Sequence, residues 1–313
     1  MPQWYGRAGT TGVTGSSDDT GTTGQASSGR RWPVPPSLLL GLVPLVVFAA
    51  VSAWRSRPSD DYGSLGQTVD SVVHALVLPE GIAVVALAVY VTALGWWRIA
   101  TVDPGRTPMR WTMTAPILIA VVCAARLPFI DWSALPGHYF VLLTVGVVFV
   151  GVFEELLTRG VLLVGLRRRL PEFGVWIASC VLFGLLHLLN VLAGAAVGST
   201  LVQVVFAASF GSTLYLSRRL TGNLLLPVLL HAFWDFGSIA VSATVDTGDL
   251  ASLLPVGVIG LVSFGVLAFG LVAGGMVAWH DDRPRRLRRR WRDVPPRGVD
   301  AVQVGDPRLP SAP

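Results

Sequence analysis

The stretch YFVLLTVGVVFVGVFEELLTRGVLLV, residues 139–164, decides the fold of this chain. It is apolar almost throughout and longer than the roughly 20 residues that a helix needs to cross a bilayer. It also carries Glu154, Glu155 and Arg159. Ionisable side chains are costly in hydrocarbon, so a membrane span that contains them is where we expect a functional site.

Seven further apolar runs approach or exceed the length of a membrane span. They lie at 37–54, 80–97, 114–130, 173–193, 199–217, 223–242 and 252–279. The run at 114–130 is the weakest, because Arg126 and Pro128 interrupt it. The predicted fold class is all-α: a polytopic membrane protein of about eight transmembrane helices, in which a core helical bundle carries the active site.

The composition excludes an ordinary soluble domain. The chain is 52% hydrophobic and 14% charged, whereas roughly a quarter of the residues of a soluble domain are charged. Every basic side chain is an arginine, and the formal net charge is +5. These arginines fall between apolar runs and in the C-terminal tail, which is typical of membrane topology and not of a nucleic-acid-binding face. The expected partner is the lipid bilayer, with no nucleic acid.

The arginines also predict an orientation, because cytoplasmic loops are enriched in them. Arginine-rich connections alternate with the arginine-free connections at 194–198 and 243–251, and Arg55 and Arg57 are the exception. The arginine-rich connections hold Arg98, Arg106, Arg110, Arg167, Arg168, Arg169, Arg218 and Arg219. We therefore expect an integral protein of the plasma membrane with both termini in the cytoplasm.

The chain divides into five predicted parts. Residues 1–35 are rich in Gly, Ser and Thr and are predicted to be a disordered cytoplasmic tail. Accessory helices follow at 36–137, the catalytic core helices at 138–242 and a C-terminal helix at 243–280. The basic tail, 281–313, is predicted to be disordered, and its arginines either bind anionic lipid headgroups or only fix the topology.

The first polar grouping holds Glu155 and Arg159 at positions i and i+4, the spacing of an ion pair within one helix. Glu154 then projects onto a neighbouring face, since adjacent helical positions differ by about 100° in direction. One carboxylate is neutralised locally while the other remains available. The alternative is that both glutamates only hold helices together.

Two further groupings repeat the i, i+4 spacing. Phe183 and His187 share one face of the fifth run, and Asn190 lies three residues beyond the histidine. His231 and Asp235 share a face of the seventh run, where the carboxylate can fix the tautomer of the imidazole. His187 also has a purely structural reading as a hydrogen-bonding contact between helices, and His231 with Asp235 as a structural polar pair. Cys123 and Cys180 lie in apolar runs and are expected to be free thiols.

Depth allows the groupings to meet. From the rise of a helix, Glu154, His187 and His231 lie on the order of 12 to 21 Å from the cytoplasmic face. A carboxylate in apolar surroundings suits a general base that activates water. Imidazoles from other helices suit stabilisation of a developing oxyanion. This combination favours hydrolysis of an acyl bond within the membrane.

The segments EELLTR, FGLLH and HAFWD, which begin at Glu154, Phe183 and His231, closely resemble a known signature. It is that of the CAAX protease and bacteriocin-processing family (CPBP, or Abi), which comprises intramembrane glutamic endopeptidases. The family pattern is EExxxR, then FxxxH, then HxxxN or a similar polar residue. The resemblance covers roughly residues 138–242, and the flanking stretch 221–233 also fits it.

The resemblance implies roles for individual residues. Glu154 would activate water with the help of His187, while His231 and Asp235 would form the oxyanion site. The residues implied as supporting are Glu155, Arg159, Phe183 and Asn190. Asp235 departs from the Asn usual in prenyl-protein proteases, so it is either protonated or orients His231. The implied substrate is a membrane-associated peptide or protein, of CAAX type or a bacteriocin leader, and no metal or cofactor is implied.

Three other functions stay open. Two histidines and several carboxylates could bind zinc in a metalloprotease, although the chain has no HExxH motif and its histidines are far apart in sequence. Glu154, Glu155, His187 and Asp235 could form the relay of a proton-coupled transporter, although no inverted repeat is visible. The chain could also be a catalytically silent scaffold or an immunity-type protein.

Overall fold

The computed structural model describes residues 34–56, 66–103, 105–245 and 248–282. Within these ranges eight helical segments are long and apolar enough to cross a membrane. They are Leu38–Arg55, Val69–Leu94, Arg110–Phe129, Gly137–Leu166, Glu172–Leu192, Val197–Thr221, Leu225–Thr244 and Leu250–Asp282. The described residues form no strand beyond an isolated bridge between Val102 and Asn223. The prediction of an all-α polytopic membrane protein is confirmed, whereas the two predicted tails lie almost wholly outside the described residues.

The long helices are α1 (Leu38–Arg55), α3 (Leu78–Leu94), α5 (Thr114–Arg126), α6 (Gly137–Glu155), α8 (Glu172–Leu186), α10 (Val197–Thr221), α11 (Leu225–Thr244) and α12 (Leu250–Asp282). Short helical turns extend or connect them. These are α2 (Val69–Val72), η2 (Val73–Val77), α4 (Trp97–Thr101), η3 (Arg110–Met113), η4 (Leu127–Phe129), η5 (Leu156–Leu162), α7 (Leu163–Leu166) and α9 (Leu189–Leu192).

The second span begins earlier than the predicted range 80–97. Thr68 caps its N-terminus in a reciprocal capping box with Ser71, which satisfies two otherwise free backbone donors. The π-helical turn η2 then leads directly into Pro79, the second residue of α3. Proline has no backbone N–H to donate to the preceding turn, and that turn is the π-helical η2. The predicted range begins at residue 80, directly after this proline, whereas the helix in fact runs through it.

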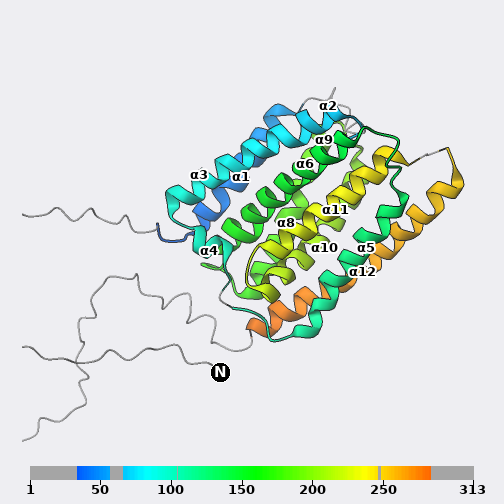
Figure 1. Cartoon of the computed structure of the whole chain (residues 1–313). Helices are drawn as coiled ribbons and strands as arrows, with labels where there is room; N and C mark the ends of the chain where they lie inside the picture. The colour runs from blue at the N-terminus through cyan, green and yellow to red at the C-terminus, as the bar shows by residue number, and fades with distance from the viewer. Residues whose placement is uncertain (1–33, 57–65, 104, 246–247, 283–313) are drawn as a thin grey trace, which may run out of the picture. The chain divides into compact units, whose positions relative to one another are not determined.

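Helix α6 lies at the centre of the site-bearing part of the bundle. It packs against α11 on one side and against α3 and η2 on another. Helix α10 packs against α8 and α12, and α5 packs against α11 and α12. Figure 1 shows α1 and α3 beyond one side of α6, with α5 and α12 beyond α11 on the other. Helices α6 and α11 can therefore direct side chains toward each other, away from the outer helices.

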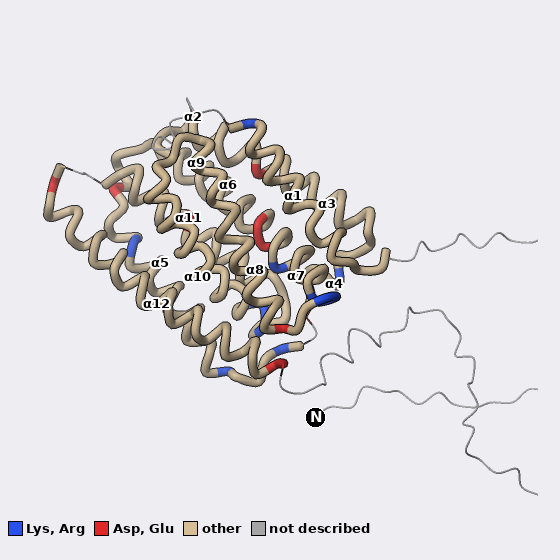
Figure 2. The backbone as a smooth tube through the Cα atoms, turned by 180° about the vertical axis from the view of Figure 1, so that it is seen from behind, with Lys and Arg blue, Asp and Glu red and all other residues tan. Residues whose placement is uncertain are grey.

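The outward faces of the bundle are apolar. Large side chains that keep more than half of their surface exposed include Leu39 (76%), Ile82 (71%), Val205 (64%) and Leu261 (72%). Figure 2 shows that charged positions are sparse along the helices and gather mainly near their ends. Apolar surface on this scale is unfavourable in water and is expected where helices face lipid. The chain is an integral membrane protein.

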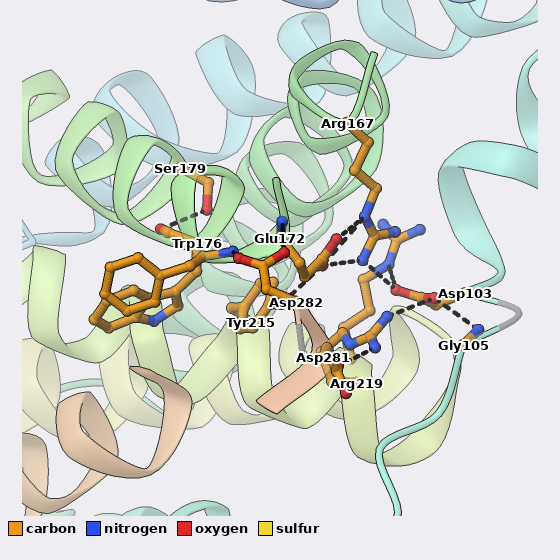
Figure 3. Close-up of polar contacts among 12 residues, drawn as sticks. Asp103, Gly105, Arg167, Glu172, Trp176, Ser179, Tyr215, Arg219, Asp281 and Asp282 are labelled. Carbon is orange, nitrogen blue, oxygen red and sulfur yellow. Dashed lines mark hydrogen bonds and ion pairs between the residues drawn. The ribbon is translucent and has the colours of Figure 1, made fainter. Parts of the chain in front are cut away.

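One end of the bundle is held by buried ion pairs around Asp103, whose side chain is fully buried (Figure 3). Arg167 Nη2 lies 2.9 Å from Asp103 Oδ2, and Arg219 Nη1 lies 3.1 Å from Asp103 Oδ1. Arg218 Nε is 3.6 Å from the same carboxylate. Glu172 accepts from Arg167, and Arg219 also pairs with Asp281. We call these residues the Asp103 cluster.

The arginines of this cluster differ from their predicted setting. The sequence pattern predicts Arg218 and Arg219 in a connection between spans, yet both lie within α10 and are almost completely buried. Arg218 donates to the Ala100 carbonyl at 2.8 Å. Their burial requires an acid from another part of the chain, and Asp103 supplies it.

Candidate active site

His231, on α11, lies at the centre of the site, where three acidic side chains surround its ring. Its Nδ1 lies 3.0 Å from Glu155 Oε1, a hydrogen-bonding distance. Its Nε2 lies 3.6 Å from Glu154 Oε2 and 3.6 Å from Asp235 Oδ2. An ionised carboxylate can only accept hydrogen bonds, so the contact with Glu155 places a proton on Nδ1. The other nitrogen, Nε2, faces the two remaining acids.

Glu155 is shared between His231 and Arg159. Arg159 Nη1 donates to Glu155 Oε1 at 2.8 Å, and both side chains are fully buried. The same nitrogen donates to Thr158 Oγ1 at 2.8 Å. The predicted ion pair within one helix is confirmed, although η5, which carries Arg159, is a π-helical turn. One buried carboxylate thus neutralises an arginine and orients an imidazole.

The two adjacent glutamates meet the same ring, which corrects the prediction that they serve separate faces. Their backbone positions do diverge, but the two side chains reach opposite nitrogens of His231. Glu155 approaches Nδ1 and Glu154 approaches Nε2. The imidazole lies between them.

Asp235 does not form the predicted hydrogen bond to His231. Its separation of 3.6 Å from Nε2 exceeds hydrogen-bonding distance. The tautomer of His231 is instead fixed from the other side by Glu155. The i, i+4 spacing brought the two groups onto one face of α11, but an acid from α6 makes the shorter contact.

Phe183 joins the second motif to the other two. Its ring meets the rings of His187 and His231 edge-on, with centroids 5.5 and 5.8 Å apart. The Arg159 guanidinium carbon lies 4.2 Å from the Phe183 ring centroid, a cation–π contact. The phenylalanine therefore packs between the arginine and both imidazoles.

His187 and Asn190 make hydrogen bonds to groups other than the acids. His187 Nδ1 is 3.2 Å from the Phe183 carbonyl oxygen, to which it can donate. No hydrogen bond between His187 and Glu154 is found in the described part of the chain. The Asn190 amide donates to Gln203 Oε1 on α10 at 2.9 Å, and in this way links α9 to α10.

Two of the acids remain accessible. The Glu154 and Asp235 side chains keep 18% and 25% of their surface exposed, whereas Glu155 keeps none. A reactant can therefore reach Glu154 and Asp235 but not Glu155. This difference separates a group that could react from one that supports the site.

Two glycines permit the close contacts. A Cβ on Gly151 would lie 2.9 Å from the Val228 carbonyl oxygen and 3.6 Å from His231 Cβ, so α6 and α11 meet backbone to backbone there. A Cβ on Gly211 would lie 2.6 Å from Arg159 Nη2. The first glycine brings Glu155 to His231, and the second leaves room for the arginine.

Sequence reasoning missed Glu80, on α3. Its Oε2 is buried without a hydrogen-bond partner, and its charge interacts with those of Glu154, His231 and Asp235. The only signal was an acid near the start of an apolar run, with no motif around it. Arg126 is a second neighbour of the site, on α5, and the sequence pattern indicates it only as an interruption of an apolar run.

The described residues contain no group of three His, Cys, Asp or Glu side chains arranged to hold a metal ion. Independence from metal stays a prediction. Both cysteines are buried free thiols, as expected.

Comparison with known proteins gives one family. Residues 136–237 match the family model described as Rce1-like, type II CAAX prenyl endopeptidase. No curated protein and no solved structure matches the chain. The match confirms the resemblance to the CAAX protease family over this segment, which contains all eight residues of the three motifs and their supporting set. Glu80 and Arg126 lie outside it.

Proposed function

We propose that the chain is an intramembrane endopeptidase of the glutamate type, which cleaves a membrane-associated peptide or protein. The similarity of residues 136–237 to CAAX prenyl endopeptidases supports a peptidase. The observation that carries the mechanism is the position of Glu154, accessible and 3.6 Å from Nε2 of a histidine whose other nitrogen is held by Glu155.

Glu154 acts as the general base. Its carboxylate takes a proton from a water molecule, and the water oxygen forms a bond to the carbonyl carbon of the scissile amide. The C–N bond then breaks, and Glu154 returns the proton to the departing nitrogen. The products are a new carboxyl terminus and a free amine, so every atom of the water is accounted for.

His231 stabilises the negative charge that develops on the carbonyl oxygen. With Nδ1–H held by Glu155, a protonated Nε2 points its N–H toward the space between Glu154 and Asp235. Asp235 favours that protonated form by its charge. His187 donates through Nδ1 to a backbone carbonyl, which leaves its Nε2 to assist Glu154.

The similarity to this family supports a substrate class. CAAX-type prenylated proteins and leader-bearing peptides both present a cleavable segment at the membrane, and the former are the substrates that the family description names. We propose the plasma membrane as the location of the protein. The Asp103 cluster would face the cytoplasm, because arginines concentrate at that end. The mechanism uses no cofactor.

The test is a comparison of membrane proteomes from cells carrying the native chain or the Glu154→Gln variant. Glutamine keeps the shape of the side chain but cannot take the proton, so we expect cleavage to fall by at least about 100-fold. Peptide termini present with the native chain should disappear with the variant. His74→Ala is the control, because His74 is exposed and pairs only with Asp70.

Other outcomes point to other functions. Full turnover by Glu154→Gln, at wild-type expression, would exclude Glu154 as the base. Loss of cleavage on addition of a chelator would favour a zinc peptidase, and identical termini in all strains would favour a scaffold. A proton-coupled transporter would instead show pH-dependent flux in vesicles without any fragment.

A further inference from the structure

Arg126 is a cation inside a membrane span that lacks an ion-pair partner among the described residues. It ends α5, within the span Arg110–Phe129. Arg126 is half-buried. The arginines with more deeply buried side chains each contact a carboxylate: Arg159, Arg167, Arg218 and Arg219. A charge in hydrocarbon is costly unless an opposite charge accompanies it. The position therefore calls for an anion that the described chain does not supply in contact.

The guanidinium of Arg126 is nevertheless held firmly in place. Its carbon lies 4.1 Å from the Trp234 ring centroid. Nη1 donates to Ser238 Oγ at 2.9 Å and to the Trp234 carbonyl at 3.4 Å. All of these partners are neutral. None of the Arg126 nitrogens is among the fully buried polar atoms without a partner, so its remaining N–H groups stay accessible.

This guanidinium belongs to the surroundings of the candidate active site. Trp234 stacks on Phe210 with centroids 5.0 Å apart, and Phe210 meets the His231 ring edge-on at 5.6 Å. The charge of Arg126 also interacts with that of Asp235, although the two form no ion pair. An anion bound by Arg126 would thus lie at the edge of the site, on the side of Trp234.

The spacing along α11 gives the distance between the scissile bond and an anion bound at Arg126. Arg126 contacts positions 234 and 238, which lie three to seven residues beyond His231 along the helix, a rise of about 5–10 Å. An extended peptide advances roughly 3.3 Å per residue. A chain held with its scissile bond at His231 would therefore reach Arg126 about two or three residues further on.

We propose that Arg126 is a specificity-determining residue that binds the C-terminal carboxylate of the substrate, two or three residues beyond the scissile bond. This inference rests on the proposed function. A guanidinium offers paired donors that match the geometry of a carboxylate. The enzyme would then select chains that end close to the cleaved bond and reject internal segments, which carry no terminal charge there.

The same donors suit the phosphate of an anionic phospholipid, so the experiment separates these two sources. The probe is a prenylated CAAX peptide, made as the free acid and as the C-terminal amide. Cleavage is measured in phosphatidylcholine vesicles with and without phosphatidylglycerol. The unmodified protein should cleave the acid with a kcat/KM about 10- to 100-fold higher than the amide in both vesicles, since a hydrogen bond to a charged group is lost.

Variants assign the preference to one residue. Arg126→Met should reduce the acid-to-amide ratio to near one, mainly through KM, and Arg126→Lys should restore part of it. Arg110→Met is the matched control, because Arg110 is an exposed arginine at the other end of the same span, and it should keep the full ratio. The ratio in the unmodified protein remains a test even if Arg126→Met does not fold.

Binding to the Glu154→Gln protein separates this inference from the proposed function. If this protein binds the free-acid peptide more tightly than the amide, and the difference disappears when Arg126→Met is added, the carboxylate site is supported even without turnover. Equal binding and equal cleavage of the two peptides overturn it. A different result favours a lipid phosphate and overturns the proposal. In that case Arg126→Met would lose cleavage only in vesicles with phosphatidylglycerol, and the acid-to-amide ratio of the unmodified protein would be one.

Discussion

A single oxygen of Glu155 contacts both a guanidinium and an imidazole. Arg159 Nη1 lies 2.8 Å and His231 Nδ1 lies 3.0 Å from Oε1, and the whole carboxylate is buried. Breaking a buried ion pair is costly because the remaining charge stays in a medium of low dielectric constant. Replacing both partners together removes that cost. The arrangement therefore predicts that removing one of the two charges destabilises the protein more than removing both.

We expect Glu155→Gln to lower the free energy of unfolding by about 3 kcal/mol, since Arg159 is then left without an opposite charge. The double variant Glu155→Gln with Arg159→Met should recover at least half of that loss. Denaturant unfolding in detergent, followed by near-ultraviolet circular dichroism, measures both changes.

Asp70→Asn is the control for this pair of variants. Asp70 also pairs with a basic residue at i+4, but its side chain is 86% exposed. Surface pairs contribute about 1 kcal/mol or less, so the change should be small. A double variant as unstable as Glu155→Gln alone would show that the buried charge of Arg159 is not the cause.

At the scale of helices, the site depends on how closely α6 approaches α11. Gly151 lies where the two backbones meet, and an added Cβ would be 2.9 Å from the Val228 carbonyl oxygen. That atom belongs to a helix backbone and cannot rotate away. Any side chain at 151 must therefore push α11, with His231, away from the glutamates of α6.

We expect Gly151→Ala to reduce kcat/KM by at least about tenfold, because a displacement on the order of 1 Å in a catalytic group can cost 100-fold. The protein should still insert and fold, since alanine favours helix. Gly260→Ala is the matched control: the residue lies in α12 with nothing within 4 Å of an added Cβ. Unchanged kinetics for Gly151→Ala would mean that α6 and α11 adjust without moving the site.

The sequence predicted the features of this site that lie within one helix better than the contacts between helices. The i, i+4 spacing found the Glu155–Arg159 pair and the shared face of Phe183 and His187, because both depend only on helix geometry. It placed Asp235 as the partner of His231, whereas the closer acid comes from α6. That contact depends on the rotation and offset of two helices, which apolar runs do not encode.

The same reasoning explains the residues that were missed. Glu80 and Arg126 reach the site from α3 and α5, and no motif surrounds either of them. Eight apolar runs predicted the eight spans, because length and composition suffice for that. The early start of the second span was missed because a capping box and a π-turn, not hydrophobicity, determine it.

At the scale of the whole molecule, the Asp103 cluster joins segments that are distant in the sequence. Asp103 follows α4 and Arg167 follows α7, while Arg219 lies in the last turn of α10 and Asp281 in the last turn of α12. Asp282 accepts from the first backbone N–H groups of α8, at 2.6 and 3.0 Å. Asp103, together with Asp281 and Asp282, thus links the ends of helices on which the site residues depend.

The pKa of Asp103 determines when this link acts. Burial alone would raise the pKa, but the guanidinium groups of Arg167, Arg219 and Arg218 together lower it well below its usual value. A carboxyl whose folded pKa is depressed contributes stability above its unfolded pKa of about 3.9 and loses it as the pH falls through the folded value. The contribution should therefore be complete at neutral pH.

Asp103→Asn should lower the free energy of unfolding by about 3–5 kcal/mol, because several buried arginines lose their common partner. The difference from the unmodified protein should stay constant between about pH 5 and pH 8 and shrink only below about pH 4. Denaturant unfolding at a series of pH values measures it, with the exposed Asp131→Asn as the control. A difference that already changes between pH 5 and pH 8 would contradict a permanently ionised Asp103. A negligible difference throughout would mean that the cluster does not hold the helix ends together.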